Sequence, residues 1–354
     1  MNVYVPFICL ALGAAINWRG LPQPVLKAFD GLMNLALIVL MAVIGINIGI
    51  SEEVMENLGR IGFNCLTISF TSIWCAVGLV VLCEKTVMPL EKIRLQVAAE
   101  ARQNPTSPLP YTSGDEGSPS GFSPLILVMP GFIIAGILVG WLVLNDMETG
   151  WVDTVLTVSL IFLYTGVGVS LASNKSVFGY IRRLGLRILW MPLAIFCGCL
   201  LGGLVSGLVL GVPLEWSVIS ASGMGYYSLT GAFLTETFGI EAGTYGFIVN
   251  VSRDVFTVML LPVLIRISKG SPIASGAAGC MDTMLVPVSR YVGPELSLVA
   301  LISGTILTFV VPVWLPFGTG LLGLICAFAQ KVLEKCENIV KTHKKVLIFE
   351  VGRV

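Results

Sequence analysis

Apolar stretches of membrane length, separated by short polar turns, make up most of this chain. A helix needs about 20 apolar residues to cross the hydrocarbon core of a bilayer. The stretches expected to form helices that cross the membrane are residues 2–16, 31–51, 61–83, 124–144, 154–172, 184–210, 243–267 and 294–317. The first is short for a full crossing, which tilting of the helix or thinning of the bilayer would accommodate. The pattern predicts an all-α integral membrane protein, a polytopic helical bundle of about 8–10 membrane segments.

The overall composition supports a membrane protein. Of the 354 residues 55% are hydrophobic and 12% are charged, with a mean hydropathy of +0.90, whereas about a quarter of a soluble domain is charged. The formal net charge is +0, so no overall field attracts nucleic acid. The single histidine is His343, and the nine cysteines have neither zinc-site spacing nor the pattern of a disulfide framework. We therefore expect no metal, no cofactor and no nucleic-acid partner, with the lipid bilayer as the surroundings.

Changes in composition divide the chain into parts. Residues 84–123 are polar and rich in proline, glycine and serine, as flexible linkers are. A lysine-rich tail closes the chain. We expect a three-helix unit at 1–83, the linker at 84–123, a second three-helix unit at 124–210, a broken-helix core at 211–318, and an apolar end with the tail at 319–354.

The two three-helix units contain a similar segment. Residues 45–51 and 166–172 each close an apolar helix with alternating small and branched side chains. Units with an odd number of crossings would have opposite orientations, as the inverted repeats of secondary transporters do. Two unrelated helix ends rich in glycine would give the same match, so the inverted repeat is one of two interpretations.

The charges of the turns predict an orientation. Basic turns face the cytoplasm, which places Arg19 with Lys27, residues 85–102 and residues 175–187 inside. The acidic turns at Glu52 and Asp146 are then outside, together with the N-terminus.

Polar residues gather in one region of otherwise apolar sequence, residues 216–267. Its small and hydroxyl-bearing residues include Ser220, Ser222, Gly223, Gly225, Ser228, Thr230 and Gly231. Taken singly, such hydroxyls more often bond to their own helix; together with the glycines they fit an unwound segment. Backbone without helical bonds survives at membrane depth only where protein or water satisfies it. We expect a re-entrant hairpin or broken crossing at 216–238, one crossing at 243–267, and a second broken or re-entrant segment at 271–292.

Ionisable side chains within this region are the sharpest feature of the sequence. Adjacent residues on a helix do not face each other, so Arg253 and Asp254 should each have another partner. Intramembrane charges are most often functional, although a structural ion pair is the alternative. Glu236 is a site residue or an interfacial one, and Tyr226 and Tyr227 are interfacial anchors or aromatic rings that hold a cation. The candidate substrate- or ion-binding residues are Ser222, Tyr226, Tyr227, Ser228, Thr230, Glu236, Asn250, Arg253, Asp254 and Asp282.

Three segments of this region resemble the LysO-type lysine exporter family. They are residues 222–239, 250–266 and 281–287, and the resemblance is strong from about 216 to 316. It implies export of L-lysine across the bacterial inner membrane, in exchange for protons. It places the motifs of the family on Tyr227, Ser228 and Leu229, on Thr235 and Glu236, on Arg253 and Asp254, and on Met281 and Asp282.

The chain departs from the family pattern at two positions. Members tend to carry Glu where this chain has Asp254, and often a further acid near the position of Asn250.

The chemistry of lysine, with two ammonium groups and one carboxylate, agrees with the residues present. Asp254, Glu236 and Asp282 supply carboxylates, and a buried acid can also carry the coupling proton. The substrate carboxylate needs an anion-binding element such as Arg253 or the N-terminus of a half-helix. We expect Arg253 to orient either Asp254 or that carboxylate.

Other functions are weighed against lysine export. Export of another small zwitterion or organic cation is the alternative within the same class. An intramembrane enzyme is disfavoured because the sequence lacks the Gly-x-Gly-Asp, His-Glu-x-x-His and Gly-x-Ser-x-Gly motifs. A channel would pass solute without coupling to a proton gradient.

Overall fold

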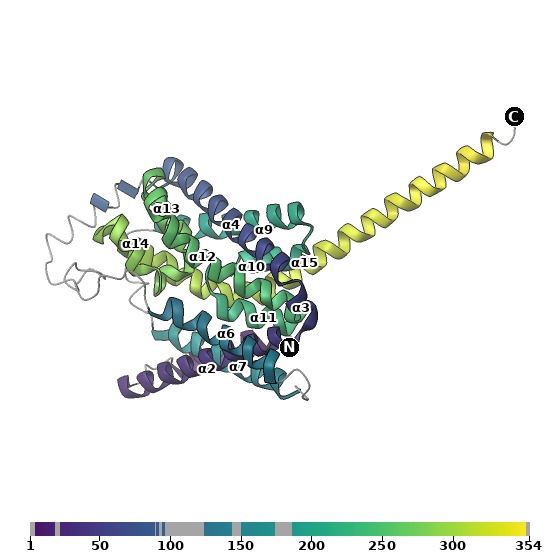
Figure 1. Ribbon diagram of the computed structural model, residues 1–354. Coiled ribbons are helices and arrows are strands. Elements are labelled where there is room, and N and C mark those ends of the chain that lie inside the picture. Colours follow the sequence, from purple (N-terminus) through teal and green to yellow (C-terminus); the bar gives the residue numbers. More distant parts are fainter. Residues whose placement is uncertain are drawn as a thin grey trace.

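The computed structural model describes residues 4–17, 22–88, 90–91, 94–95, 124–143, 150–173 and 186–351, which are helical and contain no strand (Figure 1). Its long helices are α1 (Tyr4–Ile16), α2 (Gln23–Ile50), α4 (Leu58–Thr86), α6 (Pro124–Val143), α7 (Gly150–Ser173), α9 (Trp190–Leu210), α12 (Ile240–Ile267) and α15 (Pro294–Val351). Its short elements are α3 (Glu52–Glu56), η1 (Leu186–Leu189), α10 (Leu214–Ala221), α11 (Tyr227–Phe238), α13 (Ser271–Gly276), η2 (Ala277–Met281) and α14 (Leu285–Val292). Most of the predicted linker lies outside the described residues, as do Asp146 and the turn at 174–185.

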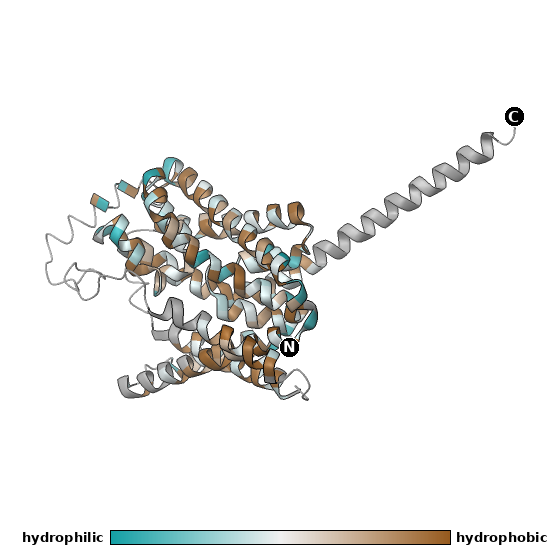
Figure 2. Cartoon of the chain, viewed as in Figure 1, coloured by the Kyte–Doolittle hydropathy of each residue, from teal (hydrophilic) through white to brown (hydrophobic). Residues whose placement is uncertain are grey.

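Five of the described helices are long and apolar enough to cross a membrane, namely α2, α4, α9 with its preceding turn, α12 and the first half of α15. Shorter apolar runs lie in α1, α6 and α7. Figure 2 shows that hydrophobic residues cover most of the described bundle. The chain is therefore a polytopic helical membrane protein, as its hydrophobic pattern predicts.

Two helix boundaries differ from the prediction. Helix α2 begins at Gln23, inside the expected polar loop, with a proline in its first turn. Proline lacks a backbone N–H, but N–H groups in the first turn of a helix make no helical hydrogen bond, so none is lost there. Helix α15 continues from Pro294 to Val351 through Pro312 and Pro316, where we expected a break near residue 318.

Glycines allow the helices of the two predicted units to pack closely. A Cβ atom at Gly45 of α2 would lie 2.3 Å from the Ile133 carbonyl oxygen of α6, and one at Gly136 of α6 would lie 2.4 Å from the Ala42 carbonyl oxygen. Helix α9 meets α4 in the same way, because a Cβ atom at Gly198 would lie 2.4 Å from the Cα atom of Ala76. The small residues noticed in the sequence therefore serve close contact between backbones.

The pairing of these helices has a regular pattern. Helix α1 packs along α7, α2 along α6, and α4 along α9. A two-fold relation that exchanges α1 with α6, α2 with α7, and α4 with α9 reproduces all three pairings. The pattern agrees with an inverted repeat of three-helix units, which stays a prediction.

The first broken segment is a re-entrant hairpin. The Trp216 ring, near the start of α10, lies 5.9 Å from the Tyr245 ring near the start of α12. Helix α11 runs back along α12, where Gly231 faces Gly243 and Phe247. Helix α10 therefore enters, and α11 leaves, at the same end of the bundle.

The second broken segment is a re-entrant hairpin from the opposite end. Lys269, just before α13, donates to Glu91 at 2.6 Å, and Glu295, just after α14, lies 3.8 Å from Arg94. Glu91 and Arg94 are themselves paired at 3.2 Å, so α13 begins where α14 ends. Helix α15 then crosses the bundle, and a Cβ atom at Gly323 would lie 3.8 Å from Glu215 beside the start of α10.

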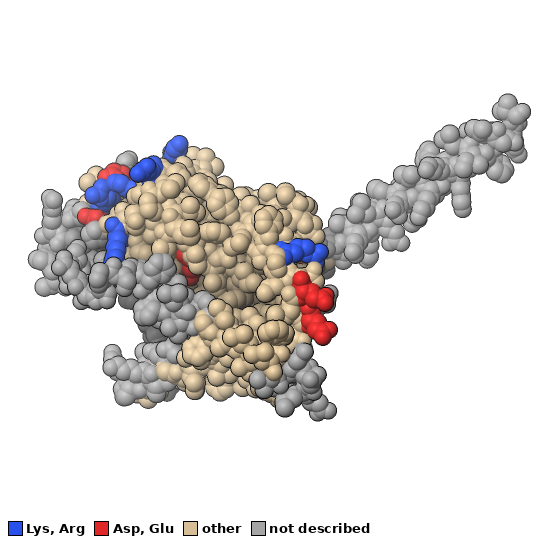
Figure 3. Space-filling view, in the orientation of Figure 1, with Lys and Arg blue, Asp and Glu red and all other residues tan. Residues whose placement is uncertain are grey.

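The two ends of the bundle differ in charge (Figure 3). Basic side chains gather over α13 and α14. Lys85, Arg266 and Arg290 are exposed in the last turns of α4, α12 and α14, and we call this the basic end. Acidic side chains gather at the opposite, acidic end, where Glu52 and Glu56 of α3 are exposed. The hydrogen bond from Lys269 holds the pKa of the Glu91 carboxyl below its ordinary value, which favours the charged carboxylate.

Candidate functional site

The tips of the two hairpins meet inside the bundle. The N–H of Ala278, in the second tip, donates to the Met224 carbonyl oxygen, in the first tip, at 3.1 Å. Each tip contains a residue other than glycine with a positive φ angle, Met224 at 53° and Ala277 at 45°. Such conformations cost energy and concentrate at functional sites.

Gly225, in the first tip, lies close to an acidic side chain. Its φ angle is 97°, and a Cβ atom there would lie 3.2 Å from Oδ1 of Asp254. Glycine adopts such an angle without the steric penalty of a side chain. The position therefore needs glycine for its conformation and for the close approach of Asp254.

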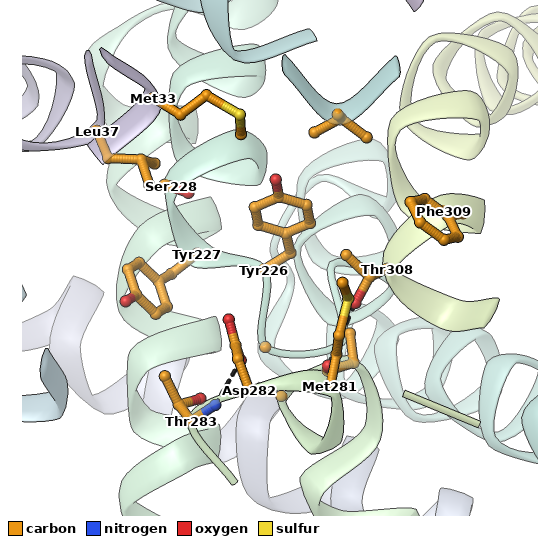
Figure 4. Close-up of a pocket in the computed structure, with 14 residues that line it drawn as sticks. Met33, Leu37, Tyr226, Tyr227, Ser228, Met281, Asp282, Thr283, Thr308 and Phe309 are labelled. Atoms are coloured by element: carbon orange, nitrogen blue, oxygen red, sulfur yellow. Dashed lines mark hydrogen bonds between the residues drawn. The ribbon is translucent and has the colours of Figure 1, made fainter. Parts of the chain in front are cut away.

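A cavity of about 240 Å³ lies beside the two tips (Figure 4). The first tip and the start of α11 supply one part of its wall, the second tip another, and α2, α7 and α15 complete it. Its lining residues are Met33, Leu37, Val167, Gly225, Tyr226, Tyr227, Ser228, Ala278, Gly279, Met281, Asp282, Thr283, Thr308 and Phe309. Drug-sized ligands occupy pockets of about 300–1,000 Å³, so this cavity suits a small solute of amino-acid size.

Four of the predicted site residues line this cavity, namely Tyr226, Tyr227, Ser228 and Asp282. Figure 4 shows the Asp282 carboxylate pointing between the two tyrosine rings. Asp282 also accepts a hydrogen bond from the N–H of Thr283, which holds the carboxylate at the tip. A carboxylate between aromatic rings is an arrangement that attracts an organic cation.

Asp254 lies behind the first tip, buried on α12 with 4% of its surface exposed. Among the described residues its Oδ1 atom has no hydrogen-bond partner. Gly225, which Asp254 approaches, lines the cavity together with Asp282. The site therefore combines a carboxylate in the cavity with a second, buried carboxylate next to the tip.

Arg253 has a different role from the one that we expected. It forms no salt bridge with Asp254 and does not line the cavity. Its Nε and Nη2 atoms donate to the carbonyl oxygens of Ser275 and Ala274, both at 2.9 Å, and Nη1 donates to Ser72 and Cys199. The guanidinium group thus satisfies carbonyl groups at the end of α13, where the helix dipole favours a cation. The expectation that Arg253 and Asp254 do not face each other is confirmed.

Asn250 fastens the first tip to α12. Its Oδ1 accepts a hydrogen bond from the Gly225 N–H at 2.7 Å. Its Nδ2 donates to the carbonyl oxygens of Ser220 at 2.9 Å and Gly246 at 2.7 Å. These neighbours require one acceptor and two donors, which a side-chain amide supplies and a carboxylate does not.

Replacing Asn250 by aspartate is therefore expected to loosen the tip. The carboxylate would face two carbonyl oxygens that have lost their donor, at a cost of roughly 1–3 kcal/mol for each unsatisfied group. We expect a lower thermal unfolding midpoint in detergent and weaker solute transport. Asn64→Asp is the matched control, because Asn64 donates only to the Tyr245 hydroxyl outside the cavity. An Asn250→Asp protein as stable and active as the wild type would contradict this role.

The remaining predicted residues lie outside the cavity wall. The Ser222 hydroxyl accepts from the indole N–H of Trp314 at 2.9 Å, which ties the tip to α15. The Thr230 hydroxyl donates to the Tyr226 carbonyl oxygen, within its own turn. Glu236 lies two turns further along α11 and accepts a hydrogen bond from Thr157 of α7 at 3.0 Å. Their roles as binding residues stay predictions.

Sequence reasoning missed the contributions of distant helices to the cavity wall. Met33 and Leu37 come from α2, Val167 from α7, and Thr308 and Phe309 from α15. Each is an ordinary residue of an apolar helix, and no local pattern separates it from residues that face lipid. Thr308 also donates to the Ala278 carbonyl oxygen at 3.2 Å, which holds the second tip.

Comparison with known proteins agrees with this geometry. The family model described as "Lysine exporter LysO" matches residues 131–319, more than half of the chain. This chain belongs to the lysine exporter LysO family. The match covers both hairpins and α12, which together carry the two carboxylates and Arg253. No solved structure matches the chain.

Two relatives illustrate the similarity within the LysO family. "Lysine exporter LysO" of Escherichia coli (strain K12) is 33% identical over 159 residues, which are 45% of this chain and 53% of that protein. "Putative lysine exporter" of Haemophilus influenzae is 28% identical over 191 residues, which are 52% of this chain and 93% of that protein. The match thus spans about half the length of the E. coli relative.

Proposed function

We propose that the chain is a secondary transporter that exports L-lysine from the cytoplasm across the bacterial inner membrane, as a proton antiporter. The observation that carries this proposal is the meeting of two opposed re-entrant hairpins beside a small cavity with a carboxylate in its wall. Membership of the LysO family supports lysine as the solute. With basic ends facing the cytoplasm, export runs from the end at α13 and α14 to the end at α3.

The side chains of the cavity supply the chemistry that a cationic amino acid needs. Asp282 pairs with an ammonium group of lysine, and the Tyr226 and Tyr227 rings add cation–π attraction. Asp254 carries the coupling proton, because it is buried and its Oδ1 atom has no hydrogen-bond partner among the described residues, so that binding a proton removes an uncompensated buried charge. Gly225 approaches Oδ1 of Asp254 and lines the cavity together with Asp282, so lysine bound at Asp282 lies close to the proposed proton site.

Access to the cavity depends on two groups of helices. Met33, Leu37 and Val167 come from α2 and α7, whereas the other lining residues come from the hairpins and α15. Helices α1, α2, α6 and α7 pack mainly with one another, and Figure 1 shows α2, α6 and α7 together on one side of the bundle. A shift of one group against the other would open the cavity to either end.

The test is efflux of radiolabelled lysine from preloaded vesicles that contain the purified protein, with and without a proton gradient. We expect efflux that requires the protein and is accelerated by the gradient. Efflux independent of the gradient would identify a uniporter or channel. An intact, inserted protein without lysine efflux would contradict lysine as the solute and direct the search to other small zwitterions or organic cations.

A further inference from the structure

The N-terminus of α11 opens onto the cavity. Gly225, Tyr226, Tyr227 and Ser228 follow one another in the cavity wall, and the 12-residue helix begins at Tyr227 without a side-chain cap. The first N–H of this helix to find a carbonyl partner is that of Thr230, which donates to Tyr226 at 3.1 Å. The preceding N–H groups, from Tyr227 to Leu229, have no helical acceptor. The positive end of the helix dipole therefore lies at the cavity.

The Ser228 hydroxyl is a second observation at the same place. Ser228 is only 3% exposed, it lines the cavity, and within the described part of the chain its hydroxyl forms no hydrogen bond. The three threonines of α11 behave differently. The hydroxyls of Thr230, Thr235 and Thr237 each donate to the carbonyl oxygen four residues earlier.

The carbonyl four residues before Ser228 belongs to Met224, which lies in the first tip with a positive φ angle and precedes the helix. That carbonyl accepts the N–H of Ala278 from the second hairpin. The Ser228 hydroxyl makes no bond to it and is available to a ligand in the cavity that it lines.

The other expected anion-binding group is not available. All three donor atoms of the Arg253 guanidinium are engaged by Ser275, Ala274, Ser72 and Cys199. The cavity wall, as the structure describes it, contains no Arg, Lys or His. A carboxylate in this cavity would therefore find its donors at the start of α11.

We propose that the first turn of α11 binds the carboxylate of the transported amino acid, through the N–H groups of Tyr227 to Leu229 and the Ser228 hydroxyl. The inference rests on the proposed function and adds that the site selects solutes that carry a carboxylate. Asp282 and the tyrosine rings recognise the cation, and α11 recognises the carboxylate. Cadaverine, which is lysine without its carboxylate, lacks one of the two attachments and binds less tightly.

The test compares binding of lysine, lysine amide and cadaverine to the purified protein in lipid nanodiscs. The wild type should bind lysine at least about tenfold more tightly than lysine amide or cadaverine. Ser228→Ala should weaken lysine binding about tenfold, as expected for the loss of one hydrogen bond to a charged group. The same replacement should leave cadaverine binding unchanged. Ser228→Asp places a negative charge where a helix N-terminus tolerates it. This variant should lose lysine binding and bind cadaverine more tightly than the wild type does.

Thr237→Ala is the matched control, because Thr237 lies on the same helix and its hydroxyl donates only to the Phe233 carbonyl oxygen. Its lysine binding should equal that of the wild type. Equal affinity of the wild type for lysine and lysine amide would overturn the inference. Unchanged lysine binding in both Ser228 variants would overturn it as well. Neither result would contradict the proposed function, which is lysine transport. A folded wild type that binds none of the three ligands would instead contradict the proposed function. The comparison of lysine with its amide uses only the wild type, so it decides the matter even if a variant fails to fold.

Discussion

Asp254→Asn is expected to abolish proton-coupled lysine efflux while the protein still folds and inserts normally. The two side chains have nearly the same shape, so the close contact with the Gly225 tip is preserved. An amide can neither carry a negative charge nor bind the coupling proton. The Oδ1 atom of Asp254 has no hydrogen-bond partner within the described structure, so no existing bond of this atom is broken by the replacement.

Efflux of radiolabelled lysine from vesicles, with equal amounts of inserted protein, measures this effect. Asp254→Glu is the matched variant, because it keeps an ionisable carboxylate at this position. We expect Asp254→Glu to retain gradient-driven efflux and Asp254→Asn to reduce it to the level of empty vesicles. Wild-type efflux from the asparagine variant would remove Asp254 from the coupling mechanism.

Arg253→Met is expected to lower the stability of the folded protein strongly. Arg253 is 1% exposed, and among the described residues its guanidinium is the side chain that donates to the carbonyl groups of Ser275 and Ala274. Loss of this donor leaves two buried carbonyl groups unsatisfied, at about 1–3 kcal/mol each. The free energy of unfolding should therefore fall by roughly 2–6 kcal/mol, and the second tip should lose its position beside the first.

Thermal unfolding of the purified protein in detergent, followed by tryptophan fluorescence, measures the loss. Arg266→Met is the matched control, because Arg266 lies on the same helix and is exposed at the basic end. Arg253→Lys should be intermediate, since an ammonium group keeps the charge but cannot reproduce the planar fork of donors. A methionine variant as stable as the control would show that α13 does not depend on this side chain.

These predictions separate two adjacent residues that the sequence presents as a pair. Arg253 and Asp254 lie on different faces of α12, because neighbours on a helix point about 100° apart. One face meets the end of α13 and the other meets the tip at Gly225. Arg253 accordingly stabilises the site, and Asp254 is the candidate for its chemistry.

The amino-acid sequence by itself determined the class of the protein and the region of its site. Apolar runs of membrane length predict helices, because lipid offers no hydrogen-bond partners and a helix pairs its own backbone N–H and C=O groups. The glycines and hydroxyls around Ser222 to Thr230 predicted a broken helix, and the break lies there. Asp282 was likewise recognisable as a candidate site residue, because an acidic side chain within a membrane segment is costly and most often functional. These conclusions rest on local features, which a single segment of chain carries.

Only the tertiary structure decided what the broken segments do. Whether residues 216–238 cross the membrane or return depends on contacts with α12, such as that of Trp216 with Tyr245, which lie far away along the chain. The roles of Asn250 and Arg253 depend on which carbonyl groups surround them. Met33 and Phe309 line the cavity because their helices pack beside it, and the two tips meet because the Met224 carbonyl accepts the N–H of Ala278. Each of these facts joins residues distant in sequence, and local pattern contains no information about which distant groups meet.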